Sequence, residues 1–170
     1  MMDIRRRMMT ATALGGLCEL YMNGDSCDDT TGGWARQNTS VNNGTLELRS
    51  TYMRFYNSET YAMASDRVTL AMTQSKIRTR RYSKLCVTYS AGQSSGDSSI
   101  VIALYSAKSS SYRSYKAYTS AKIQSDNSTQ RTLTLNISGI TDDLYVGIFW
   151  ETKAGTDENH ILFVHRVWLE

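Results

Sequence analysis

The sequence predicts an all-β protein, built as an antiparallel β-sandwich or jelly roll. The first observation is composition: the 170 residues include no proline and eleven tyrosines, and they are rich in serine and threonine, which favours strands joined by polar turns. The second is that short apolar segments alternate with a period of two residues from Cys18 onward. The third is that turn dipeptides such as Asn43-Gly44 and Ser138-Gly139 separate many short strands, a pattern typical of sandwiches.

The two ends of the pattern define the predicted domain. Residues 1–16 place apolar side chains opposite arginines at near-helical spacing and end at Gly15-Gly16, which predicts a short helix or tail. Residues 17–170 form the predicted sandwich domain, because a chain of this length is expected to hold one core. No signal peptide is expected, since Leu17 stands where a lipobox needs a small residue.

The strands are predicted from alternation and from the positions of turns. They are Cys18–Met22, Trp34–Gln37, Thr45–Arg49, Met53–Tyr56, Arg67–Met72, Lys84–Ser90, Ile100–Ser106, Tyr112–Thr119, Thr132–Ile137, Leu144–Glu151 and Ile161–Leu169. Four of them alternate most clearly, and we assign their apolar residues to the inner faces of the sandwich. Those residues are Val68, Leu70 and Met72; Leu85, Val87 and Tyr89; Leu133, Leu135 and Ile137; and Tyr145, Gly147 and Phe149.

The charge pattern excludes several classes of partner. The formal net charge is +3 and the basic residues are scattered, so no nucleic-acid partner is expected. No segment approaches the ~20 consecutive apolar residues of a membrane span, so no membrane partner is expected. The three cysteines are Cys18, Cys27 and Cys86. They match no metal-ligand spacing and fit a reducing compartment, with a Cys18–Cys27 disulfide as the alternative.

One predicted loop is acidic and provides the candidate metal ligands, Asp25, Asp28 and Asp29. Carboxylates in such loops bind hard cations such as calcium. The alternative is a solvated turn with Asx hydrogen bonds, which we favour because the spacing fits no EF-hand pattern. No cofactor is therefore expected, and a structural calcium ion remains the alternative.

Aromatic rings are the candidates for ligand binding, because flat rings beside polar groups suit the apolar face of a pyranose. The candidate ligand-binding residues are Tyr52, Arg54, Tyr56, Tyr61, Tyr112 and Tyr115. Tyr52 and Tyr56 can share a face of one strand. Tyr112 and Tyr115 fall on opposite faces if their strand is regular. The alternative for each tyrosine is a role in the core, in strand pairing or in a subunit contact, and Trp34 is expected to lie in the core.

A basic run comprises Lys76, Arg78, Arg80, Arg81 and Lys84. We expect a solvated loop, as is usual for runs of charge. Contact with an anionic glycan or a teichoic acid phosphate is the alternative.

The protein is not expected to be an enzyme. Its two histidines, His160 and His165, are accompanied by no GxSxG elbow, HExxH helix or P-loop. His165 alternates with Phe163 and Val167, which predicts a buried and hydrogen-bonded histidine rather than a catalytic one.

Four segments taken together resemble a known family: LYMNGDSCDDTTGGW, YSKLCVTYS, RTLTLNISGITDDLYVGIFW and VWLE. They resemble uncharacterised prophage tail-associated or structural proteins of Gram-positive gut bacteria, in which an arginine- and methionine-rich segment precedes a β-sandwich. The resemblance implies a non-catalytic tail-fibre or virion module that contacts other tail subunits and a host cell-surface glycan, as a homo-oligomer such as a trimer. The implied location is the virion, or the bacterial cytoplasm before assembly.

A second similarity is to carbohydrate-binding modules of the jelly-roll type, with a galactose-binding-domain-like fold. Asn23, Gly24, Gly33 and Trp34 match the layout of those modules around the acidic loop. The Phe-Glu pair usual in that loop is missing from this sequence, so the similarity does not extend to a structural calcium site. Two alternative functions follow, a free-standing carbohydrate-binding module and a degenerate glycan hydrolase.

Overall fold

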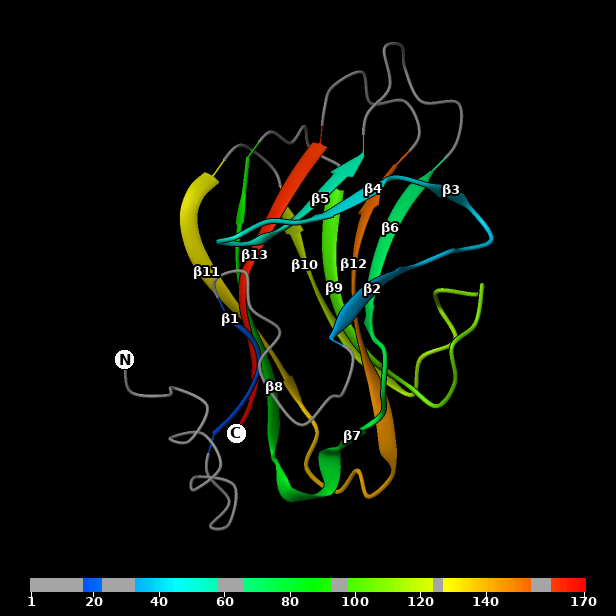
Figure 1. The fold of residues 1–170 in the computed structure, drawn as a ribbon, viewed down its shortest axis with the longest axis vertical. Coiled ribbons are helices and arrows are strands. Elements are labelled where there is room, and N and C mark those ends of the chain that lie inside the picture. Colours follow the sequence, from blue (N-terminus) through cyan, green and yellow to red (C-terminus); the bar gives the residue numbers. More distant parts are fainter. Residues whose placement is uncertain (1–16, 23–32, 58–65, 93–97, 124–126, 154–159) are drawn as a thin grey trace.

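The computed structural model consists of two packed β-sheets (Figure 1). It describes residues 17–22, 33–57, 66–92, 98–123, 127–153 and 160–170. The predicted all-β sandwich is confirmed, whereas the predicted N-terminal helix or tail, residues 1–16, lies outside the described residues. Within the described ranges, no helix is long and apolar enough to cross a membrane.

The first sheet, sheet A, is built around its C-terminal strand. Its strands are β1 Cys18–Met22, β4 Thr45–Leu48, β5 Met53–Asn57, β8 Lys84–Ala91, β11 Asn127–Asn136 and β13 His160–Leu169. Their order is β11–β8–β13–β5–β4, and every neighbouring pair is antiparallel. The first half of β13 pairs with β5 and its second half with β1, so one long strand holds both short ones.

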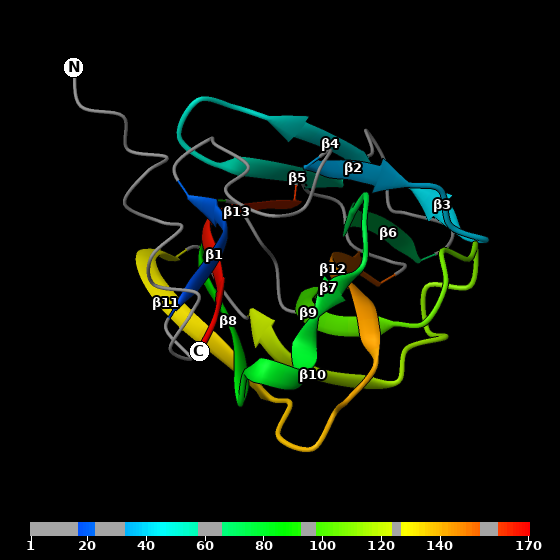
Figure 2. The ribbon, with the colours of Figure 1, turned by 60° about the horizontal axis from the view of Figure 1, so that its bottom comes forward.

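The second sheet, sheet B, lies across the core from sheet A (Figure 2). Its strands are β2 Trp34–Gln37, β3 Asn42–Asn43, β6 Arg67–Thr73, β7 Ile77–Arg78, β9 Ser98–Tyr105, β10 Ala117–Ile123 and β12 Asp143–Thr152. The order is β10–β9–β12–β6–β2, with the short β3 parallel to β6 and β7 paired with the start of β12. A 3-10 helix, Thr79–Arg81, follows β7.

The main core fills the space between the sheets. Apolar side chains from both sheets form one buried cluster, in which Phe55 and Val164 of sheet A meet Ile102 and Trp150 of sheet B. Trp34 belongs to the same cluster, and its indole nitrogen donates a hydrogen bond of 3.1 Å to the carbonyl oxygen of Leu20. The prediction of a core tryptophan at the start of β2 is confirmed.

A second apolar cluster covers the outer face of sheet B. Its buried members are Val68, Leu70, Met72, Val101, Ala103, Tyr105, Tyr112 and Phe149. Two of the four inner-face predictions are therefore wrong: on β6 and β12 the predicted residues point outward, and Ala71, Val146 and Ile148 point into the core. The cause is that these strands are apolar on both sides, so alternation alone does not identify the inner side. The predictions for β8 and β11 are confirmed.

The segment between β9 and β10 provides the cover for this outer face. The predicted strand Tyr112–Thr119 is wrong, because β10 begins at Ala117. Tyr112 and Tyr115 precede the strand and both pack on the outer cluster of sheet B, so the expectation of opposite faces is wrong as well. The other predicted strands are present with ends shifted by a few residues, the largest shift being the start of β11 at Asn127 rather than Thr132.

Candidate functional site

The structure divides the predicted ligand-binding residues between the two outer faces of the sandwich. Arg54 and Tyr56 lie on β5 of sheet A, and Tyr52 immediately precedes that strand. Tyr112 and Tyr115 pack on sheet B. These two groups cannot form one platform, because the whole core separates them. Tyr61, also predicted to bind ligand, lies outside the described residues.

The outer face of sheet A carries an open group of four rings and one guanidinium group. We call this group the aromatic face: Tyr52, Arg54, Tyr56, Phe163 and His165. The Tyr52 ring meets Phe163 edge to face, with 4.7 Å between ring centroids and 65° between ring planes. His165 also meets Tyr52 edge to face, at 6.2 Å between centroids. All five side chains are half-buried, so their rings are held in place and still reach solvent.

Strand pairing brings these residues together from distant parts of the chain. Arg54 is the register partner of Phe163, and Tyr56 is the partner of Ile161, in the antiparallel ladder between β5 and β13. Side chains of directly paired residues stand on the same face of a sheet. The face is therefore continuous across two strands that are about a hundred residues apart in sequence.

His165 lies on this face by regular alternation from Phe163, and a β-bulge begins at this residue. Val164 pairs with Tyr89 and Arg166 pairs with Thr88, so His165 is the extra residue on β13. A bulge sends two successive side chains to one side of the strand. The prediction that His165 is buried is wrong: it is half-buried on the outer face beside Phe163, and the bulge turns only Val167 into the core.

The predicted hydrogen bond of His165 is confirmed. Its Nε2 atom lies 2.9 Å from the Ser90 hydroxyl oxygen. Burial lowers the pKa of His165 below the ordinary histidine value of 6.5, so the neutral imidazole is favoured near pH 7. A neutral imidazole paired with a hydroxyl offers both a donor and an acceptor to a polar ligand.

An ion-paired carboxylate borders the aromatic face on the β4 side. Glu47 pairs with Arg49 and with Arg54, whose Nη1 lies 3.3 Å from the carboxylate. The hydrogen bond from Arg49 holds the pKa of Glu47 below its ordinary value. The Arg54 guanidinium also stacks 4.8 Å from the centroid of the Tyr56 ring. Glu47 and Arg54 are thus fixed with polar atoms beside the rings.

The far end of the same sheet face is closed. The Arg166 guanidinium covers the Trp168 ring at 4.3 Å from its centroid and pairs with both carboxylate oxygens of Glu19. Trp168 is only 9% exposed. The rings of Tyr52 and Phe163 are consequently more accessible than that of Trp168.

The tyrosines on sheet B make internal contacts instead. Tyr105 donates a hydrogen bond of 2.7 Å to the Tyr112 carbonyl oxygen, and Tyr112 donates one of 2.9 Å to Glu151. Burial, together with that hydrogen bond, raises the pKa of Tyr112 to about 12. Arg113 and Lys153 complete the ion pairs of Glu151. These contacts fasten the segment before β10 to the sheet.

Sequence reasoning identified Tyr52, Arg54 and Tyr56 but missed their partners on β13. Phe163 was visible only as a residue that alternates with His165, and Glu47 as an ordinary strand residue. The missing information is the pairing of β5 with β13, which no local pattern contains.

The metal-site prediction is untested by the structure. Asp25, Asp28 and Asp29 lie outside the described residues, as does Cys27. In the part of the chain that is described, no group of three or more His, Cys, Asp or Glu side chains is arranged to hold a metal ion.

Comparison with known proteins identifies the fold. No family model and no curated protein sequence matches the chain. Among solved structures, the xylan-binding module CBM15 is similar with a TM-score of 0.52 and 10% identity, over 90% of this chain and 94% of that one. A family 29 carbohydrate-binding module complexed with mannohexaose is similar with a TM-score of 0.51 and 12% identity, over 90% and 89% of the two chains.

A larger enzyme contains a similar fold. The glycoside hydrolase domain structure of Endo-D from Streptococcus pneumoniae R6 matches with a TM-score of 0.55 and 13% identity, over 81% of this chain. The match spans only 21% of that structure. The chain therefore has the β-sandwich fold found in several carbohydrate-binding modules and in one part of a glycan-processing protein.

Proposed function

We propose that the protein is a non-catalytic carbohydrate-binding module, and that it binds an uncharged stretch of a glycan on the aromatic face of sheet A. The observation that carries the proposal is the half-buried ring group of Tyr52 and Phe163, with paired polar groups on both sides. The similarity in fold to modules that bind glycans supports it.

The chemistry of the face suits a sugar ring. The C–H surface of a pyranose packs against aromatic rings, and its hydroxyl groups need donors and acceptors in fixed positions. Glu47 and Arg54 supply these on the β4 side, and the pair of Ser90 and His165 supplies them on the β8 side. Because these groups are already ordered by one another, binding costs little additional side-chain entropy.

The same binding function serves two settings. A free-standing module would attach to a polysaccharide, and a phage tail module would attach to the glycan of a host cell surface. The tail role, the tail-subunit partners, the homo-oligomer and the virion location remain predictions from the sequence resemblance. Elution of the full chain as a trimer in size-exclusion chromatography with light scattering would support the tail setting, and tail genes beside this one would support it independently.

The binding proposal is tested with purified protein and neutral polysaccharides, such as xylan, glucomannan and galactan, in affinity electrophoresis followed by calorimetry. Replacement of a stacking ring, in Tyr52→Ala or Phe163→Ala, is expected to weaken binding about tenfold, since about 1.4 kcal/mol corresponds to tenfold. Tyr118→Ala is the matched control, because Tyr118 is 52% exposed on the opposite sheet. Equal affinities in all variants would refute the placement, and absence of binding across the neutral panel would refute the function.

A further inference from the structure

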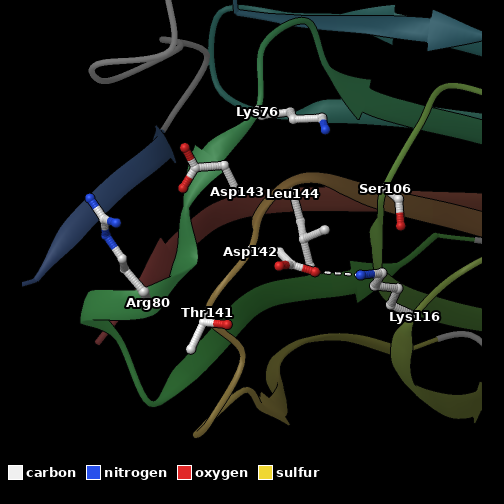
Figure 3. Close-up of a pocket in the computed structure, with 8 residues that line it drawn as sticks. All are labelled: Lys76, Arg80, Ser106, Lys116, Thr141, Asp142, Asp143 and Leu144. Carbon is white, nitrogen blue, oxygen red and sulfur yellow. Dashed lines mark hydrogen bonds and ion pairs between the residues drawn. The ribbon is translucent and has the colours of Figure 1, made fainter.

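A pocket of about 380 Å³ opens at one end of sheet B, where the strands meet the basic run (Figure 3). It is lined by Lys76, Arg80, Ser106, Lys116, Thr141, Asp142, Asp143 and Leu144. These residues come from the turn after β6, the 3-10 helix, both ends of the covering segment and the start of β12. In Figure 3 the Arg80 side chain lies on the side of the pocket away from Ser106 and Lys116.

Two carboxylates line the pocket: Asp142 is paired with a lysine, and the single negative charge of Asp143 is outnumbered by the positive charges of Lys76 and Arg80. Asp142 pairs with Lys116, and the hydrogen bond from Lys116 holds the pKa of Asp142 below its ordinary value. The backbone around Asp142 is fixed as well, because the Thr79 hydroxyl donates a hydrogen bond to its carbonyl oxygen. The Lys116–Asp142 pair therefore adds no net charge to the pocket.

Two lysines lie near one aromatic ring at this end of sheet B: Lys76 lines the pocket, and Lys108 follows the lining residue Ser106 by two positions in the sequence. The ammonium nitrogens of Lys76 and Lys108 lie 5.8 Å and 5.3 Å from the centroid of the same ring, that of the half-buried Tyr145. Neither lysine forms an ion pair with a described residue. The Tyr145 ring attracts both ammonium groups, which favours side-chain positions near that ring.

Both ammonium groups add positive charge at this end of the sheet, and a carboxylate or phosphate group can accept charge-assisted hydrogen bonds from them. The ring holds the pair in position before any ligand arrives, so less side-chain entropy is lost on binding. Beyond the lysines, the Ser106 and Thr141 side chains line the pocket with hydroxyl groups that can hydrogen-bond to a polar ligand.

We propose that this pocket and the neighbouring Lys108 form an anion-binding site for an acidic saccharide, in which Lys76 and Lys108 bind a carboxylate or phosphate group and the pocket receives the attached sugar. The site is separate from the aromatic face and lies on the other sheet, so it does not depend on the binding function proposed above. Two residues of the basic run belong to this site. Lys76 binds the anionic group, and Arg80 adds positive charge to the pocket.

The experiment measures binding of the full chain to three polymers at low salt: polygalacturonate, poly(glycerol phosphate) and neutral glucomannan. The double variant Lys76→Gln/Lys108→Gln is expected to lose about tenfold in affinity for at least one of the two anionic polymers. Preference for polygalacturonate would identify a sugar carboxylate as the ligand group, and preference for poly(glycerol phosphate) would identify a phosphate.

The control is Lys122→Gln, which removes a positive charge from the opposite end of the same sheet. Lys122 lies there as the strand-register partner of Ser99 in the ladder between β10 and β9. Its affinity is expected to stay within about twofold of the parent, because only distant charge is lost. The single variants Lys76→Gln and Lys108→Gln are measured as well, and a loss in Lys122→Gln equal to that in either of them would overturn the proposal, since it would indicate unspecific attraction. Absence of binding to both anionic polymers would also overturn it.

The neutral polymer separates the two sites. Glucomannan affinity is expected to be unchanged by the lysine variants, and anionic-polymer affinity is expected to be unchanged by Tyr52→Ala. Thermal unfolding of each variant checks that the fold is retained, which is expected because both lysine side chains are exposed.

Discussion

The two outer faces of the sandwich differ although both carry aromatic residues. On sheet A, Tyr52 and Phe163 are half-buried, and charged or polar side chains surround them. On sheet B, Tyr105 and Phe149 are almost fully buried beneath a segment of the chain that folds back over the strands. An aromatic residue on an outer face can therefore belong to an open surface or to a second core.

The difference shows what decides the fate of a sheet face. A face with polar residues between its rings remains in contact with water, and the outer face of β5 and β13 is of this kind. A face of continuous apolar residues needs a cover, and the segment between β9 and β10 provides it on sheet B. The stability of the fold should consequently depend more on the outer face of sheet B. The binding of neutral glycans should depend more on the outer face of sheet A.

The largest expected effect compares two phenylalanines, one on each outer face. Phe149→Ala is expected to destabilise the protein by about 3–5 kcal/mol, because Phe149 is 2% exposed and its ring packs on Tyr112. Phe163→Ala is expected to cost only about 1 kcal/mol, since half-buried positions lose less contact. Urea unfolding followed by circular dichroism measures both, and similar losses would contradict the division into a second core and an open surface.

An intermediate effect is expected where β12 passes beneath Tyr105. A Cβ atom added at Gly147 would lie 2.5 Å from the Tyr105 ring, so Gly147→Ala is expected to cost about 1–3 kcal/mol through overpacking. Tyr105→Phe frees the ring from its hydrogen bond to Tyr112 and lets it move aside. The Gly147→Ala/Tyr105→Phe double variant should therefore lose less stability than the sum of the losses in the two single variants.

A control for this prediction is Gly139→Ala. Gly139 has a φ of 85° and no heavy atom within 4 Å of an added Cβ, so its replacement costs backbone strain without a clash, and its loss should be additive with that of Tyr105→Phe. Additive losses in the Gly147 and Tyr105 variants would show that the contact between them is not tight.

The smallest expected effect concerns pH and the attachment of the covering segment. Burial alone would raise the pKa of Glu151, but hydrogen bonds from Tyr112, Arg113 and Lys153 outweigh it and lower the pKa below 4.5. A carboxyl group with a lowered folded-state pKa contributes stability above its unfolded pKa, and this contribution is lost as pH falls through the folded value. Unfolding free energy should therefore decrease below about pH 4.5.

Glu151→Gln isolates this contribution from those of other carboxylates. The variant is expected to be less stable than the parent at pH 7, and the difference should shrink as pH falls from about 5 towards 3. Urea unfolding at several pH values measures it. A difference that stays constant over this range would show that the Glu151 charge does not hold the segment in place.

The sequence was sufficient for the fold class, because turn positions and alternation are local properties. It was sufficient for the core position of Trp34 as well. It did not distinguish the two sides of β6 and β12: on β6 the small Ala71 points inward and the larger Leu70 outward, and on β12 both sides carry large rings, Trp150 inside and Phe149 outside. The size of a side chain is a poor guide when both sides of a strand are covered.

The candidate site was predictable only in part. Tyr52, Arg54 and Tyr56 are close in sequence, so their shared location could be inferred. Phe163 and His165 join them through pairing between distant strands, which has no local signature in the sequence. Lys76 and Lys108 both lie near the Tyr145 ring because the turn after β6 and the covering segment reach the same end of sheet B.

The central position of β13 has a consequence for how the protein folds during synthesis. Sheet A cannot close until His160–Leu169 is available, because β13 pairs with β1, β5 and β8. Those strands are synthesised much earlier and must wait without their main partner, and such distant pairings make folding slow. The unpaired edges of β5 and β8 are exposed during that interval, so nascent chains that stall before His160 should be the species most prone to aggregate or to require a chaperone.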